Sequence, residues 1–262
     1  MSATLGMQIN FKLWLLAFFK KVSGPAKYLF LLLSLEMLTW SDAFYGQPTG
    51  APPAGIGWSD LIVAMTLLAG VVAINRRKWV LAVAVTLAVL TLGTVWAAGL
   101  LQTKPLYIAG ELSAVLFLAF TACVVWHDIG QTEGVTADTL VGSVCCYALI
   151  AATWAFAYSL TDFLVPGSFQ FPAGAAGIAG QVAPHPDYAL LLYYSFVTLC
   201  SVGYGDVTPL SPAARMLATG EAVAGQFYMA VLVARLVSLH LEHARHKRAA
   251  APSAEIEPLK RD

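Results

Sequence analysis

The sequence predicts an all-α integral membrane protein with six transmembrane helices and a short re-entrant helix and loop between the last two. The first observation is composition: 58% of the 262 residues are hydrophobic and 11% are charged, whereas a soluble domain carries about twice that share of charge. The mean hydropathy is +0.71. The second is a series of apolar runs that approach the roughly 20 residues needed to cross the hydrocarbon. The third is a shorter apolar run that leads into Gly-Tyr-Gly.

Six apolar runs define the spans, and breaks rich in Pro, Gly or basic residues separate them. In chain order, the predicted spans are 28–45, 59–74, 79–101, 106–126, 139–160 and 213–240. The polar stretch 127–138 is expected to divide a four-span domain, 28–126, from a second domain, 139–240. A segment 1–27 precedes the first domain, and a short tail, 241–262, follows the second.

The segment before the first span contains an aromatic run with basic flanks, residues 11–21, which is too short to cross a membrane. Two interpretations are open: a helix lying in the cytoplasmic interface, or a loosely attached arm. No cleavable signal peptide is expected, because residues 1–10 lack a basic region followed by an apolar core. The tail from residue 249 is rich in Ala, Pro and charges and is expected to be disordered.

The distribution of Lys and Arg orients the chain, since loops that retain these residues are cytoplasmic. Basic residues precede the first span and follow the second and sixth, which places them all on one side when the number of spans is even. They are Lys12, Lys20, Lys21, Lys27, Arg76, Arg77, Lys78, Arg245, Lys247 and Arg248. Lys104 and Arg215 fall on the other side. We therefore expect a multi-pass protein of the cell (inner) membrane with both termini in the cytoplasm.

The run 187–198 is apolar and helix-like but too short to cross. Asp187, which follows Pro184 and Pro186, is suited to a helix N-terminus. Non-helical backbone at membrane depth is tolerated only where it is buried in protein or lines an aqueous path. The run and the loop after it are therefore either a re-entrant segment or an extramembrane loop.

The glycine spacing of that loop favours a re-entrant segment. Successive carbonyls point toward one axis only when φ/ψ alternates in hand, and glycine takes φ > 0 without steric cost. Gly203 and Gly205 supply this alternation, while Val202 and Tyr204 turn their side chains away from the axis. The Ser201 hydroxyl adds a further oxygen. The preceding helix would point the negative end of its dipole at a central cavity and favour a cation there.

The run 201–206, Ser-Val-Gly-Tyr-Gly-Asp, resembles the signature of potassium channels. Over about 139–240 the chain looks like the two-helix pore domain of the bacterial ion-channel family. The resemblance implies a homotetramer, so the partners are three further copies. It also implies K⁺ as the transported ion with no other cofactor. The selectivity filter it implies is Ser201, Val202, Gly203, Tyr204 and Gly205, with the carbonyls of the first four and the Ser201 hydroxyl facing the ion.

The resemblance also implies roles around the filter. Tyr193 and Tyr194 match an aromatic cuff, and Gly225 matches the inner-helix hinge. Further positions assigned by the resemblance are Thr198, Cys200 and Asp206 as filter support and, with helical spacing, Gln226, Met229 and Val233 as cavity lining. Three positions depart from the family pattern: Ser201 and Cys200 replace threonines, and Val197 replaces a glutamate that some members pair with the aspartate equivalent to Asp206.

Charged residues within spans are functional by default, because exposing them to lipid is costly. Glu221 either braces the back of the short helix by hydrogen bonding or senses protons directly. Arg235, near the cytoplasmic end, is expected to snorkel. Glu36 and Glu111 lie either between the leading spans or near the interfaces. The fourth span has no Lys or Arg, which predicts a channel without an intrinsic voltage sensor.

His240, His243 and His246 recur at helical spacing before Lys247 and Arg248. They form either a face that touches anionic headgroups or a cytosolic pH sensor. The formal net charge is zero, so nucleic acid is not an expected partner.

The function predicted from the sequence is passive, potassium-selective conduction, with a weakly selective monovalent cation channel as the alternative. A membrane enzyme or receptor is a different class. The spans contain no HExxH, GxSxG or paired-aspartate arrangement that supports catalysis, so no enzymatic activity is predicted. A non-conducting regulatory membrane protein is favoured only if the loop does not assemble.

Overall fold

A computed structural model describes residues 27–44, 58–73, 78–101, 103–132, 136–172 and 188–250. Within these ranges the regular elements are helices and two short strands, joined by turns and loops. The elements are α2 (Lys27–Phe44), α3 (Trp58–Ala73), α4 (Lys78–Leu101), α5 (Lys104–Gly130), α6 (Ala137–Leu164), β1 (Phe169–Gln170), α7 (Tyr188–Leu199), β2 (Thr208–Pro209) and α8 (Pro212–Ala250). The predicted interfacial run, 11–21, lies outside the described residues.

A helix occupies each of the six predicted spans, and α7 occupies the predicted short run. Four helical segments among the described residues are long and apolar enough to cross a membrane: α4, α5, α6 and residues Pro212–Ser238 of α8. These segments make the chain a multi-pass membrane protein. The first two predicted spans correspond to the shorter helices α2 and α3, of 18 and 16 residues.

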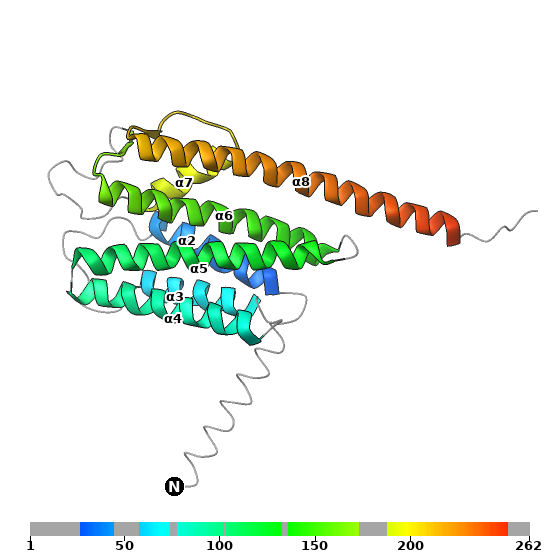
Figure 1. Cartoon of the computed structure of the whole chain (residues 1–262), viewed down its shortest axis with the longest axis horizontal. Coiled ribbons are helices and arrows are strands. Elements are labelled where there is room, and N and C mark those ends of the chain that lie inside the picture. Colours follow the sequence, from blue (N-terminus) through cyan, green and yellow to red (C-terminus); the bar gives the residue numbers. More distant parts are fainter. Residues whose placement is uncertain are drawn as a thin grey trace, which may run out of the picture.

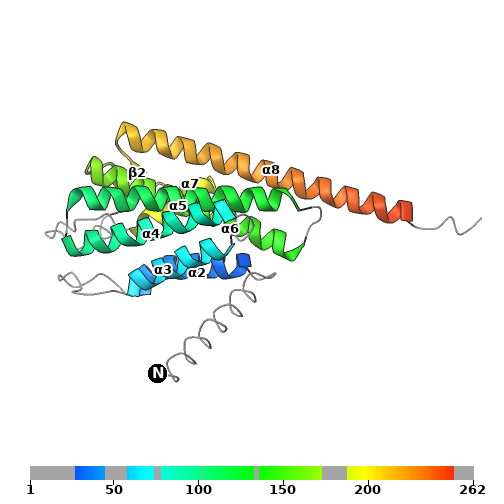
Figure 2. The same ribbon diagram turned by 60° about the horizontal axis from the view of Figure 1, so that its bottom comes forward.

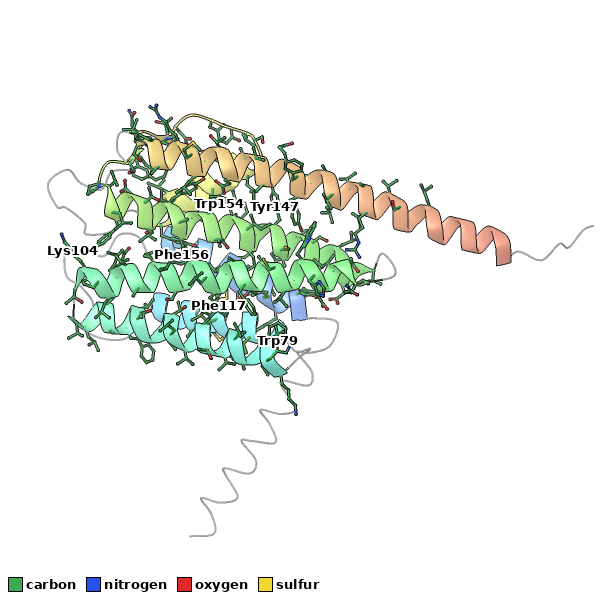
Figure 3. The ribbon with its side chains drawn as sticks, viewed as in Figure 1. Trp79, Lys104, Phe117, Tyr147, Trp154 and Phe156 are labelled. Carbon is green, nitrogen blue, oxygen red and sulfur yellow. The ribbon has the colours of Figure 1, made fainter. Side chains whose placement is uncertain are left out.

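The helices lie side by side in a bundle (Figure 1). The neighbours in contact include α3 with α4, α4 with α5, α5 with α6, α2 with α3 and α6, α6 with α7 and α8, and α7 with α8. Buried side chains such as Leu31, Phe117 and Leu149 belong to one apolar cluster whose members come from α2, α3, α5, α6, α7 and α8. Lys104 and Trp79 mark opposite ends of this bundle (Figure 3).

Small residues set how closely the N-terminal helices approach the rest of the bundle. An added Cβ at Gly142 of α6 would lie 3.0 Å from the Tyr28 ring of α2, so the absence of a side chain there lets the two helices touch. The Tyr28 hydroxyl also donates a hydrogen bond to Asp128 near the end of α5. α2 is therefore bound to α6 by close packing and to α5 by a polar contact.

Two helices extend beyond the spans predicted for them. α5 continues to Gly130, so the break before α6 is shorter than 127–138; Thr136 begins α6 by accepting a hydrogen bond from the Thr139 amide at 3.2 Å. α8 continues to Ala250 rather than ending at His240, so the predicted tail 241–262 is helical in its first part. The reason is composition: residues 241–250 are rich in Leu, Glu, Ala, Arg and Lys, which are strong helix formers, and the next proline is Pro252.

The C-terminal half of α8 projects beyond the end of the bundle (Figures 1 and 2). At the other end of the bundle, β1 pairs antiparallel with β2, with Phe169 opposite Pro209. The Leu210 amide donates to the Ser168 carbonyl at 2.7 Å, and the Ser168 amide donates to Asp162 at 2.8 Å. This ribbon joins the chain after α6 to the chain after the Gly-Tyr-Gly loop and fixes where that loop ends.

Candidate functional site

The helix α7 leads into the loop and supports it. α7 is buried in the bundle because its sequence is apolar. Leu191, Leu192, Tyr194, Ser195 and Leu199 are buried, and the helix packs between α6 and α8. After Leu199 the regular helical pattern is lost, because the amides of Ser201 and Val202 bond to carbonyls three and five residues back instead of four. Cys200 donates to Phe196, Ser201 to Thr198 and Val202 to Val197, each at 2.9 Å.

The loop backbone alternates in hand. Ser201, Gly203 and Gly205 have φ of +56°, +61° and +80°. Val202 and Tyr204 between them are not among the residues with positive φ. The alternation at the two glycines agrees with the sequence prediction, whereas the positive φ of Ser201 was not predicted and is costly for a residue with a Cβ.

The loop carbonyls have no hydrogen-bond donor among the described residues. Within the part of the chain that the structure describes, the carbonyl oxygens of Ser201, Val202, Gly203 and Tyr204 accept no hydrogen bond. The side chains of Val202 and Tyr204 are 51% and 71% exposed. Carbonyl oxygens can accept hydrogen bonds or coordinate a cation, so the loop offers these oxygens to a group outside the described chain.

Asp206 closes the loop at the β2 end. Its carboxylate accepts a hydrogen bond from the Tyr193 hydroxyl at 2.8 Å and one from the Val207 amide at 3.0 Å. Val197, at the position where a glutamate partner is absent, instead lines a groove behind the loop together with Tyr194 and Thr198. Tyr193 therefore serves as the partner of Asp206 in this chain.

Glu221 lies at the centre of three helices. Its side chain is fully buried, with 0% exposure. Its carboxyl oxygens are hydrogen-bonded to the Tyr158 hydroxyl of α6 and to the Ser195 hydroxyl of α7. The Ser195 hydroxyl also lies 2.8 Å from the Ala151 carbonyl of α6. Hydrogen bonding between Glu221 and the short helix, which is one of the two interpretations drawn from the sequence, is present.

Aromatic rings surround this contact. The Tyr194 ring lies 5.2 Å from the Tyr158 ring and 5.6 Å from the Phe169 ring, measured between centroids. Tyr147 and Trp154 stand on the side of α6 that faces α8 (Figure 3). The Tyr147 hydroxyl donates to the Cys200 sulfur at 3.4 Å, so Cys200 is held from behind by α6.

α8 crosses the end of α7 at Gly225. An added Cβ there would lie 2.3 Å from the carbonyl oxygen of Leu199, closer than any real contact. α8 is unbroken through Gly225. The next residue, Gln226, places its side-chain Nε2 2.7 Å from the hydroxyl of Ser201. Met229 and Val233, further along α8, are exposed.

The other charged residues considered within the predicted spans lie outside the surroundings of the loop. Arg235 Nη2 donates to the Thr132 carbonyl at 3.1 Å, which joins α8 to the α5–α6 connection. The Ser159 hydroxyl of α6 donates to Glu111 of α5 at 3.3 Å, so Glu111 lies between these two helices. Glu36 is exposed on α2 and borders a small cavity with residues of α6 and α7. The side chains of His240, His243 and His246 lie outside the description.

Sequence reasoning missed Tyr158, Ser195 and Tyr147. Each is a hydroxyl in an apolar helix, which signals a buried hydrogen-bond partner but not its identity. Their partners, Glu221 and Cys200, lie 63, 26 and 53 residues away along the chain. Only the packing of α6, α7 and α8 brings these pairs together.

The loop and its helices match an ion-channel family. An ion-channel family model matches residues 113–241, from within α5 into α8. Protein LctB of Geobacillus stearothermophilus is 32% identical over 129 residues, which are 49% of this chain and 91% of that protein. Protein LctB of Bacillus caldotenax is 52% identical over 46 residues, 18% of this chain and 34% of that protein.

Two pore potassium channel c of Oryza sativa subsp. japonica is 35% identical over 87 residues, 33% of this chain. The match spans only 19% of the length of that plant protein. No solved structure matches the chain.

Proposed function

This chain belongs to the ion-channel family, and from that premise we propose that four copies assemble around one axis and conduct potassium ions passively through the loop 201–205. Membership of this family identifies a channel rather than an enzyme. Potassium as the ion is supported by the name of the plant relative, a two pore potassium channel, and by the chemistry of the loop.

The observation that carries the proposal is the set of four loop carbonyls without hydrogen-bond partners in the described chain. A potassium ion that enters a narrow path loses its water and needs oxygens in its place, and rings of backbone carbonyls supply them in potassium-channel filters. The alternation of φ at Ser201, Gly203 and Gly205 is the backbone pattern that turns successive carbonyls to one side. The Ser201 hydroxyl adds the innermost oxygen.

We propose a tetramer because the loop of a single copy cannot surround an ion. One loop offers one carbonyl at each level, which cannot replace the hydration shell of an ion. The side chains of Val202 and Tyr204 stand off the loop largely uncovered within one chain. We infer that neighbouring copies cover them and complete each ring. Fourfold symmetry is the closed arrangement that potassium-channel filters use.

The surroundings of the loop have supporting roles in this proposal. Tyr193 and Asp206 hold its outer end, while Tyr194, Thr198 and Cys200 support it from behind. Glu221 fixes α7, and therefore the loop, to α6 and α8. The cavity beneath the loop is lined by one face of α8, with Gln226, Met229 and Val233 at i, i+3 and i+7.

Gating and membrane placement are extensions of the same proposal. α8 bends at Gly225 when the channel opens, since a glycine in a helix is its weakest point. We place the channel in the cell (inner) membrane with both termini in the cytoplasm. The basic end of α8 lies near anionic headgroups. K⁺ is the transported ion, and no other cofactor is required.

A weakly selective monovalent cation channel is the alternative, and one observation favours it. Ser201 replaces the threonine of the family pattern, so the innermost oxygen lacks the methyl group that restricts the rotamer. A looser oxygen ring discriminates less well between potassium and sodium. The reversal potential in a potassium/sodium gradient separates the two candidates, because it shifts toward the potassium equilibrium potential only if the filter is selective.

The deciding experiment is ion flux from liposomes that contain the purified protein. We expect potassium flux in the wild type and none in Gly203→Ala, since a Cβ penalises the φ of +61° at this position. The matched control is Gly99→Ala in α4, where an added Cβ has nothing within 4 Å and flux should persist. Equal flux in Gly203→Ala and Gly99→Ala would reject the loop as the ion path.

A further inference from the structure

The contact between Gln226 of α8 and Ser201 of the loop joins the inner helix to the innermost oxygen of the proposed filter. Gln226 Nε2 lies 2.7 Å from Ser201 Oγ. The approach depends on Gly225, since a Cβ there would lie 2.3 Å from the Leu199 carbonyl oxygen. The close crossing of α8 and α7 is therefore what brings the amide of Gln226 within reach of the loop.

In this contact the Gln226 amide is the donor and the Ser201 hydroxyl oxygen is the acceptor. A serine hydroxyl has one hydrogen and two lone pairs, and without a second substituent on Cβ it rotates freely between rotamers. An amide N–H donated to Oγ occupies one lone pair and holds the hydroxyl in one rotamer. The other lone pair then points in a fixed direction and stays available to a cation.

We propose that Gln226 is a positioning residue for the innermost ion site: its amide fixes the Ser201 hydroxyl and does the work of the methyl group that a threonine would supply there. The inference rests on the proposed function. It makes selectivity depend on a residue of the cavity wall as well as on the loop itself. A Gln226 that only fills the cavity wall would have no coupling to Ser201.

The test is the potassium/sodium permeability ratio, obtained from reversal potentials of the reconstituted protein under a potassium/sodium gradient. Gln226→Leu removes the amide, and Gln226→Asn keeps an amide but shortens its reach by one methylene. We expect both to lower the ratio by about twofold to tenfold, the size that loss of one hydrogen bond predicts. A matched control, Thr86→Val, removes a hydroxyl that bonds only within exposed α4, and should leave the ratio unchanged.

Two double variants distinguish a positioning role of Gln226 from a nonspecific loss of structure. In Ser201→Thr the methyl group fixes the rotamer, so Gln226→Leu should then lower the ratio by less than about twofold. In Ser201→Ala there is no hydroxyl to position, so Gln226→Leu should have no further effect. Assembly of each variant is measured by size-exclusion chromatography. If Gln226→Leu does not assemble, the permeability ratio of Gln226→Asn is used for the same comparisons.

The outcomes separate this inference from the function it rests on. A wild type that conducts sodium as well as potassium overturns the proposed selectivity. A selective wild type with unchanged ratios in both Gln226 variants overturns the positioning role alone. Equal losses on the Ser201, Ser201→Thr and Ser201→Ala backgrounds also overturn it, because the effect of Gln226 would then be independent of the hydroxyl.

Discussion

Ser195 of α7 presents one hydroxyl to two oxygens at once, the Glu221 carboxyl and the Ala151 carbonyl, the latter at 2.8 Å. A serine hydroxyl has a single hydrogen, and a carbonyl oxygen can only accept. Both contacts are satisfied if Ser195 donates to Ala151 and Glu221 carries a proton that it donates to Ser195. The Tyr158 hydroxyl then donates to the second carboxyl oxygen.

Hydrogen counting therefore predicts that Glu221→Gln is tolerated. The glutamine amide repeats the pattern of the neutral acid, with a donor toward Ser195 and an acceptor toward Tyr158. We expect thermal unfolding in detergent to change little in Glu221→Gln. In Glu221→Ala we expect a loss of about 2–5 kcal/mol from the cavity and the unpaired hydroxyls. A glutamine variant as unstable as the alanine variant would mean that the ionised carboxylate is required.

Infrared spectroscopy gives a second measurement of the same prediction. The difference spectrum between the wild type and Glu221→Gln should contain the carbonyl stretch of a protonated carboxylic acid. A carboxylate band in that difference would contradict the hydrogen count, whatever the channel conducts.

Gly225→Ala distinguishes close packing from a hinge. The added Cβ would lie 2.3 Å from a backbone carbonyl oxygen, which cannot move without displacing the end of α7. We expect a loss of stability of about 1–3 kcal/mol together with impaired conduction. The matched variant is Gly220→Ala on the same helix, where the nearest atom, in Trp154, is an ordinary 3.4 Å away. A hinge alone would alter gating in Gly225→Ala and leave its stability equal to that of Gly220→Ala.

The local features of the site could be predicted from the sequence, and the contacts between helices could not. The short helix follows from a run of apolar residues, and the φ of Gly203 and Gly205 follows from what glycine alone does at no cost. The positive φ of Ser201 could not be foreseen, because serine normally avoids it.

The pairs that hold the loop depend on packing instead. Gln226 meets Ser201 only because Gly225 lets α8 approach the end of α7. In the same way, the sequence does not reveal the partner of the Tyr193 hydroxyl. The fold of the loop places Asp206 beside it. The end of α8 was missed for a different reason, since the helix outlasts its apolar stretch.

Tyr193→Phe and Asp206→Asn should both weaken the outer end of the loop, because each affects the same hydrogen bond. The two side chains share a hydrogen bond of 2.8 Å on an exposed part of the chain. A double-mutant cycle on the unfolding of the assembled protein, measured in potassium, should show that the effects of the two substitutions are not additive. Additive effects of the two substitutions would show that the pair does not cooperate in holding the loop.

Conduction is expected to depend only weakly on voltage. α5, the fourth predicted span, has Lys104 at its first residue and no other Lys or Arg up to Gly130. A steep response needs about three to four charges per subunit moving through the membrane field, and α5 carries none at regular spacing. Current–voltage relations of the reconstituted protein in symmetric potassium should therefore be close to linear. A sharply sigmoidal conductance would contradict this and would require mobile charges in a part of the protein other than α5.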